Sequence, residues 1–138
     1  MVDEAGANKK ILAMMLFSGP YGSQEADHMC RIADKALDKG YGVQIFLYGD
    51  GVHAQMEGQA PKVFFNVGEA FTKLVEKGAV IKSCVRCSQA RGYIDGEFDE
   101  EQDRYPSSRS LDAVKIYSMY GFIDMIKKGD RVITFGGS

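Results

Sequence analysis

The stretch KILAMMLFSGPYGS, residues 10–23, decides the fold of this chain. Its first part, residues 10–17, predicts a buried β-strand because every residue after Lys10 is apolar, and residues 18–23 have the glycine, proline and serine of a turn. Apolar residues then recur at helical spacing over residues 24–39, and Gly40 follows as a C-terminal cap. The segment therefore predicts a strand, a turn and a helix, which is the first βα unit of an α/β protein.

The same alternation continues along the chain. Further strands are predicted at residues 43–48, 79–82, 93–94 and 131–135, and further helices at residues 61–78 and 111–125. The charged residues 95–109 lack an apolar period and are expected to form a solvated loop, with a lid over a binding site as the alternative. Strands that alternate with helices form right-handed βαβ crossovers, so we predict a mainly parallel sheet with helices on both faces. Residues 1–8 are expected to be a loose lead-in to a single α/β domain at residues 9–138.

Composition and charge exclude several classes of function. The chain has 138 residues, 45% of them hydrophobic and 26% charged, which is ordinary for one globular domain. The net charge is -2, so there is no excess of positive charge to bind nucleic acid directly. The longest apolar run, residues 11–17, is too short to span a membrane, and the acidic Asp3 and Glu4 before it do not fit a signal peptide. We therefore expect a cytoplasmic protein.

Residues suited to chemistry cluster in four segments that each follow a predicted strand. In a parallel sheet, ligands bind outside the carboxyl ends of the strands. All four segments should therefore lie at one edge of the sheet. They are residues 18–23, 49–53, 83–87 and 136–138.

Cys84 is the strongest candidate for a catalytic residue. It follows a predicted strand and begins a turn into a helix, where unpaired backbone N–H groups favour a negative charge. Arg86 and Arg91 add positive charge nearby, and a thiolate is the form of cysteine that attacks sulfur. These features predict a Cys84 pKa below the usual value of about 8.5. The alternative is an inert core cysteine, which the polar residues around Cys84 disfavour.

Cys84 and Cys87 form a C-x-x-C motif, a spacing at which two sulfur atoms can meet across one helical turn. Three roles fit the motif: a redox disulfide, half of a zinc site, or a sulfur-accepting thiol with a second thiol that resolves it. Zinc is the weakest of the three because no second C-x-x-C or H-x-x-H pair supplies the other ligands. We predict no metal and no cofactor. The third cysteine, Cys30, lies on the apolar face of the first helix and is expected to pack in the core.

Six further residues are candidates for binding a substrate. Residues 18–23 open a helix, so they form either a cradle for an anion or nucleotide or only a tight turn, and they match neither G-x-G-x-x-G nor the Walker pattern. His53 is expected at the same sheet edge as Cys84, although a lone loop histidine is usually solvated. The candidates are Gly19, Tyr21, Gly22, Asp50, His53 and Arg86.

Several short motifs together resemble the DsrE/TusD family of sulfur-relay proteins. Each motif is weak alone, whereas their order and spacing over most of the chain make the resemblance specific. They are SGPYGSQ at residues 18–24, FLYGDGV at 46–52, CV at 84–85, RG at 91–92 and DRVITFG at 130–136.

The resemblance implies both a fold and an activity. The implied fold is a three-layer α/β/α domain with a five-stranded, mainly parallel sheet, DsrEFH-like and flavodoxin-like in outline. In the family, the cysteine at the Cys84 position accepts sulfane sulfur as a persulfide and hands it to a partner protein. The implied function is a sulfurtransferase or sulfur carrier with partners of the TusA or DsrC/TusE kind, assembled as a homo-oligomeric trimer or hexamer or with paralogous subunits.

Two other functions stay open: a dithiol redox protein that uses Cys84 and Cys87, and a non-catalytic module that binds a nucleotide or an anion. Substitution of the cysteines separates them. A sulfur carrier on Cys84 predicts that Cys84→Ser abolishes sulfur loading and that Cys87→Ser leaves it intact. A redox protein needs both thiols, and a binding module needs neither.

Overall fold

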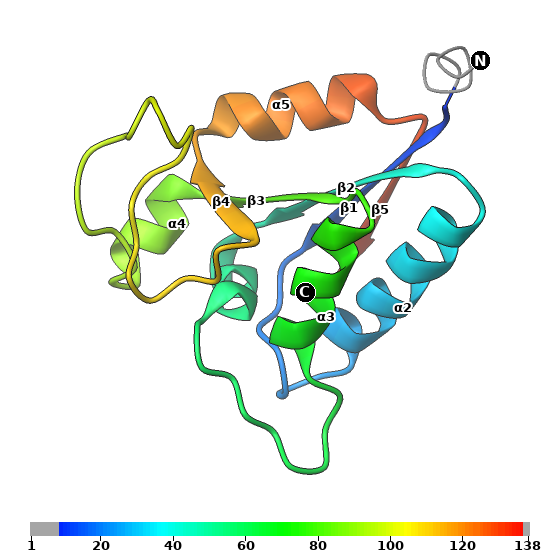
Figure 1. Cartoon of the computed structure of the whole chain (residues 1–138), viewed down its shortest axis with the longest axis horizontal. Coiled ribbons are helices and arrows are strands. Elements are labelled where there is room, and N and C mark those ends of the chain that lie inside the picture. The colour runs from blue at the N-terminus through cyan, green and yellow to red at the C-terminus, as the bar shows by residue number, and fades with distance from the viewer. Residues whose placement is uncertain (1–8, 137–138) are drawn as a thin grey trace.

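The computed structural model describes residues 9–136, which contain one five-stranded parallel sheet (Figure 1). The strands are β1 (Ile11–Leu16), β2 (Gly42–Leu47), β3 (Val80–Cys84), β4 (Val114–Tyr117) and β5 (Arg131–Phe135). Their order is β4-β3-β2-β1-β5, and all neighbouring pairs are parallel. The predicted five-stranded parallel sheet is therefore confirmed. The lead-in predicted at residues 1–8 lies outside the described residues.

Helices cover both faces of the sheet and complete the three layers (Figure 1). α2 (Glu25–Asp38) and α3 (Val67–Glu76) pack side by side on one face, and α5 (Met119–Lys128) lies on the other. Two short elements follow β2 and β3 directly: the 3-10 helix η1 (Gly49–Gln55) and the helix α4 (Val85–Ala90). Both short elements therefore begin at the carboxyl edge of the sheet.

β1 lies inside the sheet and is buried on both faces. Met14 and Leu16 pack in the core beneath α2 and α3, whereas Ala13 and Met15 pack in the core beneath α5. Successive side chains of a strand point to opposite faces, so one strand serves both cores. A strand buried on both faces is apolar throughout, which is the pattern that residues 11–17 show.

The second long helix begins later than its sequence predicts. α3 begins at Val67 rather than at residue 61, because the Asn66 side chain accepts a hydrogen bond from the Glu69 N–H at 2.9 Å and caps the helix there. The apolar residues before the cap lie in an irregular loop, in which Phe64 is exposed. Apolar spacing alone therefore extended the predicted helix into this loop.

The fourth strand also lies elsewhere than predicted. It is β4 at Val114–Tyr117, not residues 93–94, and its buried Val114 and Ile116 fall within the range predicted for the last helix. That helix begins only after Ser118, whose hydroxyl accepts a hydrogen bond from the Tyr120 N–H at 3.2 Å. Val114 and Ile116 are two positions apart, which is the period of a strand, but Val114 is also three positions from Leu111, which is helical spacing, so the pattern was ambiguous here.

The charged residues 95–109 are anchored to the outer edge of the sheet. The Tyr105 N–H donates to the Ile116 carbonyl of β4 at 3.0 Å, which adds an antiparallel bridge. The Phe98 ring packs edge-on against the rings of Tyr105 and Tyr117. The segment is thus only in part the solvated loop that its charges predict, because its aromatic residues pack against β4.

Candidate functional site

Segments that follow neighbouring strands meet at the carboxyl edge of the sheet, as the sequence predicts. The Gly49 N–H, just after β2, donates a hydrogen bond to the Cys87 Sγ, just after β3, at 3.2 Å. Gly136, just after β5, packs so closely on Ser18 that a side chain there would collide with the serine hydroxyl. Residues 137–138 of the fourth predicted segment lie outside the described part of the chain.

Close packing of η1 against β1 fixes this edge. A Cβ on Gly51 would lie 2.1 Å from the backbone carbonyl oxygen of Leu16, so only glycine fits at this position. Gly49 has a φ of 60°, in the left-handed region that glycine adopts without strain. The turn that brings the Gly49 N–H to Cys87 therefore depends on two glycines in the Gly49-Asp50-Gly51 motif.

Cys84 is the last residue of β3 and caps α4. Its Sγ accepts a hydrogen bond from the Cys87 N–H at 3.4 Å. The side chain is 1% exposed and packs with Met15, Phe46 and Met125 in the core beneath α5. The predicted position at a strand-to-helix turn is therefore correct, but the thiol lies in an apolar environment.

This environment raises the pKa of the Cys84 thiol. The main cause is burial, which disfavours the thiolate, and the hydrogen bond from the Cys87 N–H offsets it only in part. The lowered pKa that the sequence predicts is thus wrong in direction. α4 is a single short helix of 6 residues, and its N–H groups do not outweigh the loss of solvation.

Cys87 lies in the first turn of α4 and is more accessible than Cys84. It is partly exposed, and its Sγ accepts the hydrogen bond from the Gly49 N–H. The Arg91 guanidinium binds the Asp50 carboxylate at 2.9 and 3.0 Å and the Cys87 backbone carbonyl at 3.0 Å, which ties α4 to η1. Arg86, predicted to bind a substrate, is exposed on the outer side of α4. Both cysteines are free thiols in the structure.

A buried polar cluster supports the turn that carries the two thiols. The fully buried Gln55 accepts a hydrogen bond from the Ser83 hydroxyl at 2.7 Å and donates one to the Ser88 hydroxyl at 3.0 Å. Ser110 donates to the same Gln55 oxygen at 3.2 Å. Gln55 is not predictable as a site residue from the sequence, because nothing local marks a glutamine in a polar segment as a core residue.

Five of the predicted substrate-binding residues line one cavity of about 550 Å³ at this edge. They are Gly19, Tyr21, Gly22, Asp50 and His53. Neither cysteine is among the residues that line the cavity, and none of its lining residues comes from residues 95–109. The structure thus brings the binding candidates together but places Cys84 beneath the neighbouring turn.

Two tyrosines order the lining of this cavity. The His53 Nδ1 lies 2.8 Å from the hydroxyl of the buried Tyr93. Burial raises the Tyr93 pKa, so its hydroxyl stays protonated and can either donate to Nδ1 or accept a hydrogen bond from it. The Tyr21 hydroxyl donates to Gln59 at 2.8 Å and accepts the Val67 N–H at 3.2 Å, so it mainly holds the loop in place.

The start of α2 is poorly suited to bind an anion. Glu25 is in the first turn of the helix, and its hydrogen bond with Ser23 lowers the pKa of the carboxyl, so the group is charged. A carboxylate at this position already interacts with the positive end of the helix. This geometry favours the tight turn over the anion cradle, the two alternatives that the sequence leaves open for residues 18–23.

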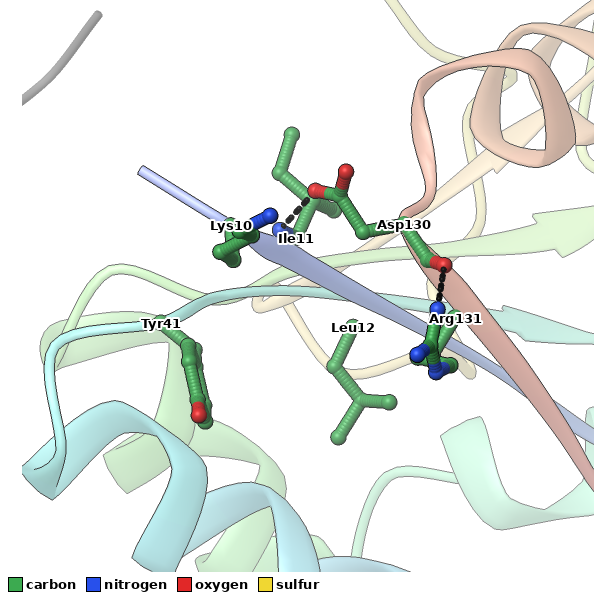
Figure 2. A pocket seen from close by; sticks show the side chains of 6 residues that line it. All are labelled: Lys10, Ile11, Leu12, Tyr41, Asp130 and Arg131. Atoms are coloured by element: carbon green, nitrogen blue, oxygen red, sulfur yellow. Dashed lines mark hydrogen bonds between the residues drawn. The ribbon is translucent and has the colours of Figure 1, made fainter. Parts of the chain in front are cut away.

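A second cavity, of about 340 Å³, opens at the opposite edge of the sheet. Figure 2 shows it between the starts of β1 and β5, with Asp130 bound to the Ile11 N–H at 2.7 Å and Lys10, Tyr41 and Arg131 around it. It lies at the amino ends of the strands, away from the cysteines. Within residues 9–136, no group of three or more metal-binding side chains is present and no helix is long and apolar enough to cross a membrane.

The fold and the edge thiols define a small parallel α/β protein with a cysteine at the carboxyl end of its third strand. The chain belongs to the DsrE/DsrF-like family, whose model matches residues 10–135. Two archaeal relatives are uncharacterized proteins. One, from Methanopyrus kandleri, is 31% identical over 91% of this chain and 93% of its own length. The other, from Methanocaldococcus jannaschii, is 32% identical over 88% of this chain and 96% of its own length.

The protein YchN of Escherichia coli is similar in both sequence and structure. Its sequence is 25% identical over 84% of this chain and 91% of its own. Its crystal structure superposes with a TM-score of 0.75 over 92% of this chain and 99% of YchN. A conserved Bacteroides thetaiotaomicron protein of unknown function gives a TM-score of 0.59 over 89% of this chain and 93% of its own. These matches confirm the predicted family and fold.

Proposed function

We propose that this protein is a sulfurtransferase that carries sulfane sulfur as a persulfide on Cys84. Membership of the DsrE/DsrF-like family supports a role in sulfur relay. The observation that carries the assignment to this residue is its position as a free thiol at the end of β3, where the Cys84 Sγ accepts a hydrogen bond from the backbone N–H of the second free cysteine, Cys87. A persulfide there is shielded by apolar side chains from water and from other thiols.

Mass spectrometry of the intact protein tests this proposal. After incubation with thiosulfate, polysulfide or a persulfidated donor, the wild-type chain is expected to gain the mass of one sulfur atom, and a reductant is expected to remove it. Peptide mapping should place the retained sulfur on Cys84. The matched control is the double variant Cys84→Ser/Cys87→Ser, which keeps Cys30 and should gain nothing. Wild-type protein that gains no sulfur from any donor would contradict the proposal.

The dithiol redox protein remains a second candidate because the two thiols are adjacent. Sulfur transfer leaves both cysteines reduced at the end of a cycle, whereas a redox protein alternates between two thiols and a Cys84–Cys87 disulfide. A stable disulfide after oxidation, without sulfur uptake, would favour the redox protein. The 550 Å³ cavity beside His53 could hold a small ligand. Such binding would accompany the thiol chemistry of Cys84 and Cys87 and would not replace it.

Partners of the TusA or DsrC/TusE kind and a homo-oligomer are part of the proposal. Apolar side chains on the α5 face support assembly: Tyr120 is 80% exposed and Ile123 is also exposed, and Val132 is exposed on the edge strand β5. Exposed apolar side chains grouped on one surface are typical of interfaces.

Light scattering tests the assembly. At micromolar concentration we expect a particle of three or six chains of 15.2 kDa each. Tyr120→Lys should reduce the mass, because it places a charge in the proposed interface, whereas Glu76→Lys, on the exposed side of α3, should leave it unchanged. A wild-type monomer under these conditions would count against the assembly.

A further inference from the structure

The two thiols of the C-x-x-C motif differ in accessibility. If Cys84 took sulfur directly from a donor, it should be the more exposed of the two, but it is the less exposed. Cys84 is buried beneath α5, and Cys87 is partly exposed at the carboxyl edge. A donor must bring its sulfur into contact with the attacking thiolate. In the folded chain, Cys87 can be reached from solvent and Cys84 cannot be reached without movement of the turn.

We propose that Cys87 receives the sulfur atom from the donor and transfers it to Cys84, where it is stored. This inference rests on the proposed sulfur-carrier function and adds a catalytic residue to it. Cys87 is then the site of transfer between molecules, and Cys84 is the site at which the sulfur is protected.

Both transfers are thiol exchanges that balance without an oxidant or a reductant. In the first, the Cys87 thiolate attacks the outer sulfur of a donor persulfide, R–S–SH; a bond from Cys87 to that sulfur forms, the donor S–S bond breaks, and the donor leaves as a thiolate. In the second, the Cys84 thiolate attacks the same outer sulfur. The bond from this sulfur to Cys87 breaks, and Cys87 takes up the proton that Cys84 gave up.

The geometry around the thiols favours this direction of transfer. The Cys84 Sγ already contacts the backbone of Cys87, at 3.4 Å from its nitrogen. The Gly49 N–H points at the Cys87 Sγ at 3.2 Å, where it stabilises the negative charge that appears on this sulfur when it leaves. Cys84 lacks such a donor from η1 and is surrounded by apolar side chains.

Burial also explains why sulfur should rest on Cys84. A thiol of higher pKa leaves more slowly from a persulfide, and burial raises the pKa of Cys84. When the sulfur returns to Cys87, the Cys84 thiolate is the leaving group, and it leaves more slowly than the Cys87 thiolate does in the forward transfer. The packing of Met15, Phe46 and Met125 around Cys84 shields the stored sulfur from other thiols.

Quenched time courses of sulfur loading from glutathione persulfide, followed by peptide mass spectrometry, test the relay. Cys87→Ser is expected to slow loading of Cys84 more than about tenfold, because the donor must wait for the turn to open. Cys84→Ser is expected to load at the wild-type initial rate, with the sulfur on Cys87. Cys30→Ala, which removes the thiol outside the site, should load as the wild type does.

The outcomes separate the relay from the function on which it rests. If Cys87→Ser and Cys87→Ala load Cys84 as fast as the wild type, Cys87 is not the receiving thiol, and the carrier function stands. If the wild type releases hydrosulfide and ends as a Cys84–Cys87 disulfide, the relay is also overturned. If the wild type loads neither thiol, the carrier function itself fails. Thermal melts of each variant confirm that it is folded.

Discussion

Gln55→Leu is expected to lower the free energy of unfolding by about 3 kcal/mol. Leucine has a similar volume but cannot accept from the Ser83 and Ser110 hydroxyls or donate to the Ser88 hydroxyl, as the fully buried Gln55 does. The hydroxyls of Ser83 and Ser88 then keep only their contact with each other, at 3.4 Å. In a chain of this size, the loss corresponds to a fall in melting temperature of about 10 °C, which calorimetry measures.

Two variants control this prediction. Gln89→Leu makes the same change on the exposed side of α4 and should alter the free energy of unfolding by no more than about 0.5 kcal/mol. The triple variant Gln55→Leu/Ser83→Ala/Ser88→Ala also removes the two buried hydroxyls that lose their hydrogen bonds to Gln55. It should therefore recover part of the lost free energy of unfolding. If Gln55→Leu alone is as stable as the wild type, the cluster does not stabilise the fold.

Local sequence patterns predict the architecture because each pattern here has one clear physical cause. Residues 11–17 are apolar throughout because β1 is buried on both faces, and the helical spacing at residues 24–39 reflects one buried face of α2. The sequence patterns gave a wrong prediction where the apolar residues of a strand and of a helix follow each other directly. Val114 and Ile116 are buried in a short strand directly before a helix, so their spacing merged with that of α5.

The position of the site is predictable, whereas its environment is not. The carboxyl-edge rule for parallel sheets places Cys84 and Cys87 beside the Gly49-Asp50-Gly51 turn. In the structure the Gly49 N–H contacts Cys87, whereas Cys84 lies in the core beneath the turn. Ser83 and Ser88 are polar neighbours of Cys84 in the sequence and therefore predict accessible surroundings for its thiol. Both serines are instead fully buried, because Gln55 supplies their hydrogen bonds from η1. A partner so distant along the chain leaves no local signal.

Iodoacetamide is expected to alkylate Cys87 in the folded protein at least about a hundredfold faster than Cys84 or Cys30, because a buried thiol reacts only when the structure opens around it. The raised pKa of Cys84 and the Cys30 pKa of about 12 reduce the thiolate fraction of the two buried thiols further. Peptide mass spectrometry at several pH values gives the rate for each cysteine.

The pH dependence distinguishes burial from activation. A Cys84 thiol activated by its turn would react first and reach a constant rate near neutral pH, whereas a buried thiol of raised pKa reacts slowly and still gains rate above pH 9, where a free thiol has already ionised. In denaturant, all three cysteines should react at similar rates, which controls for the reagent. Cys87→Ser should leave Cys84 slow, because its protection comes from Met15, Phe46 and Met125 rather than from Cys87. Rapid alkylation of Cys84 at pH 7 in this variant would overturn the buried-thiol description, and with it the physical reason for a relay through Cys87.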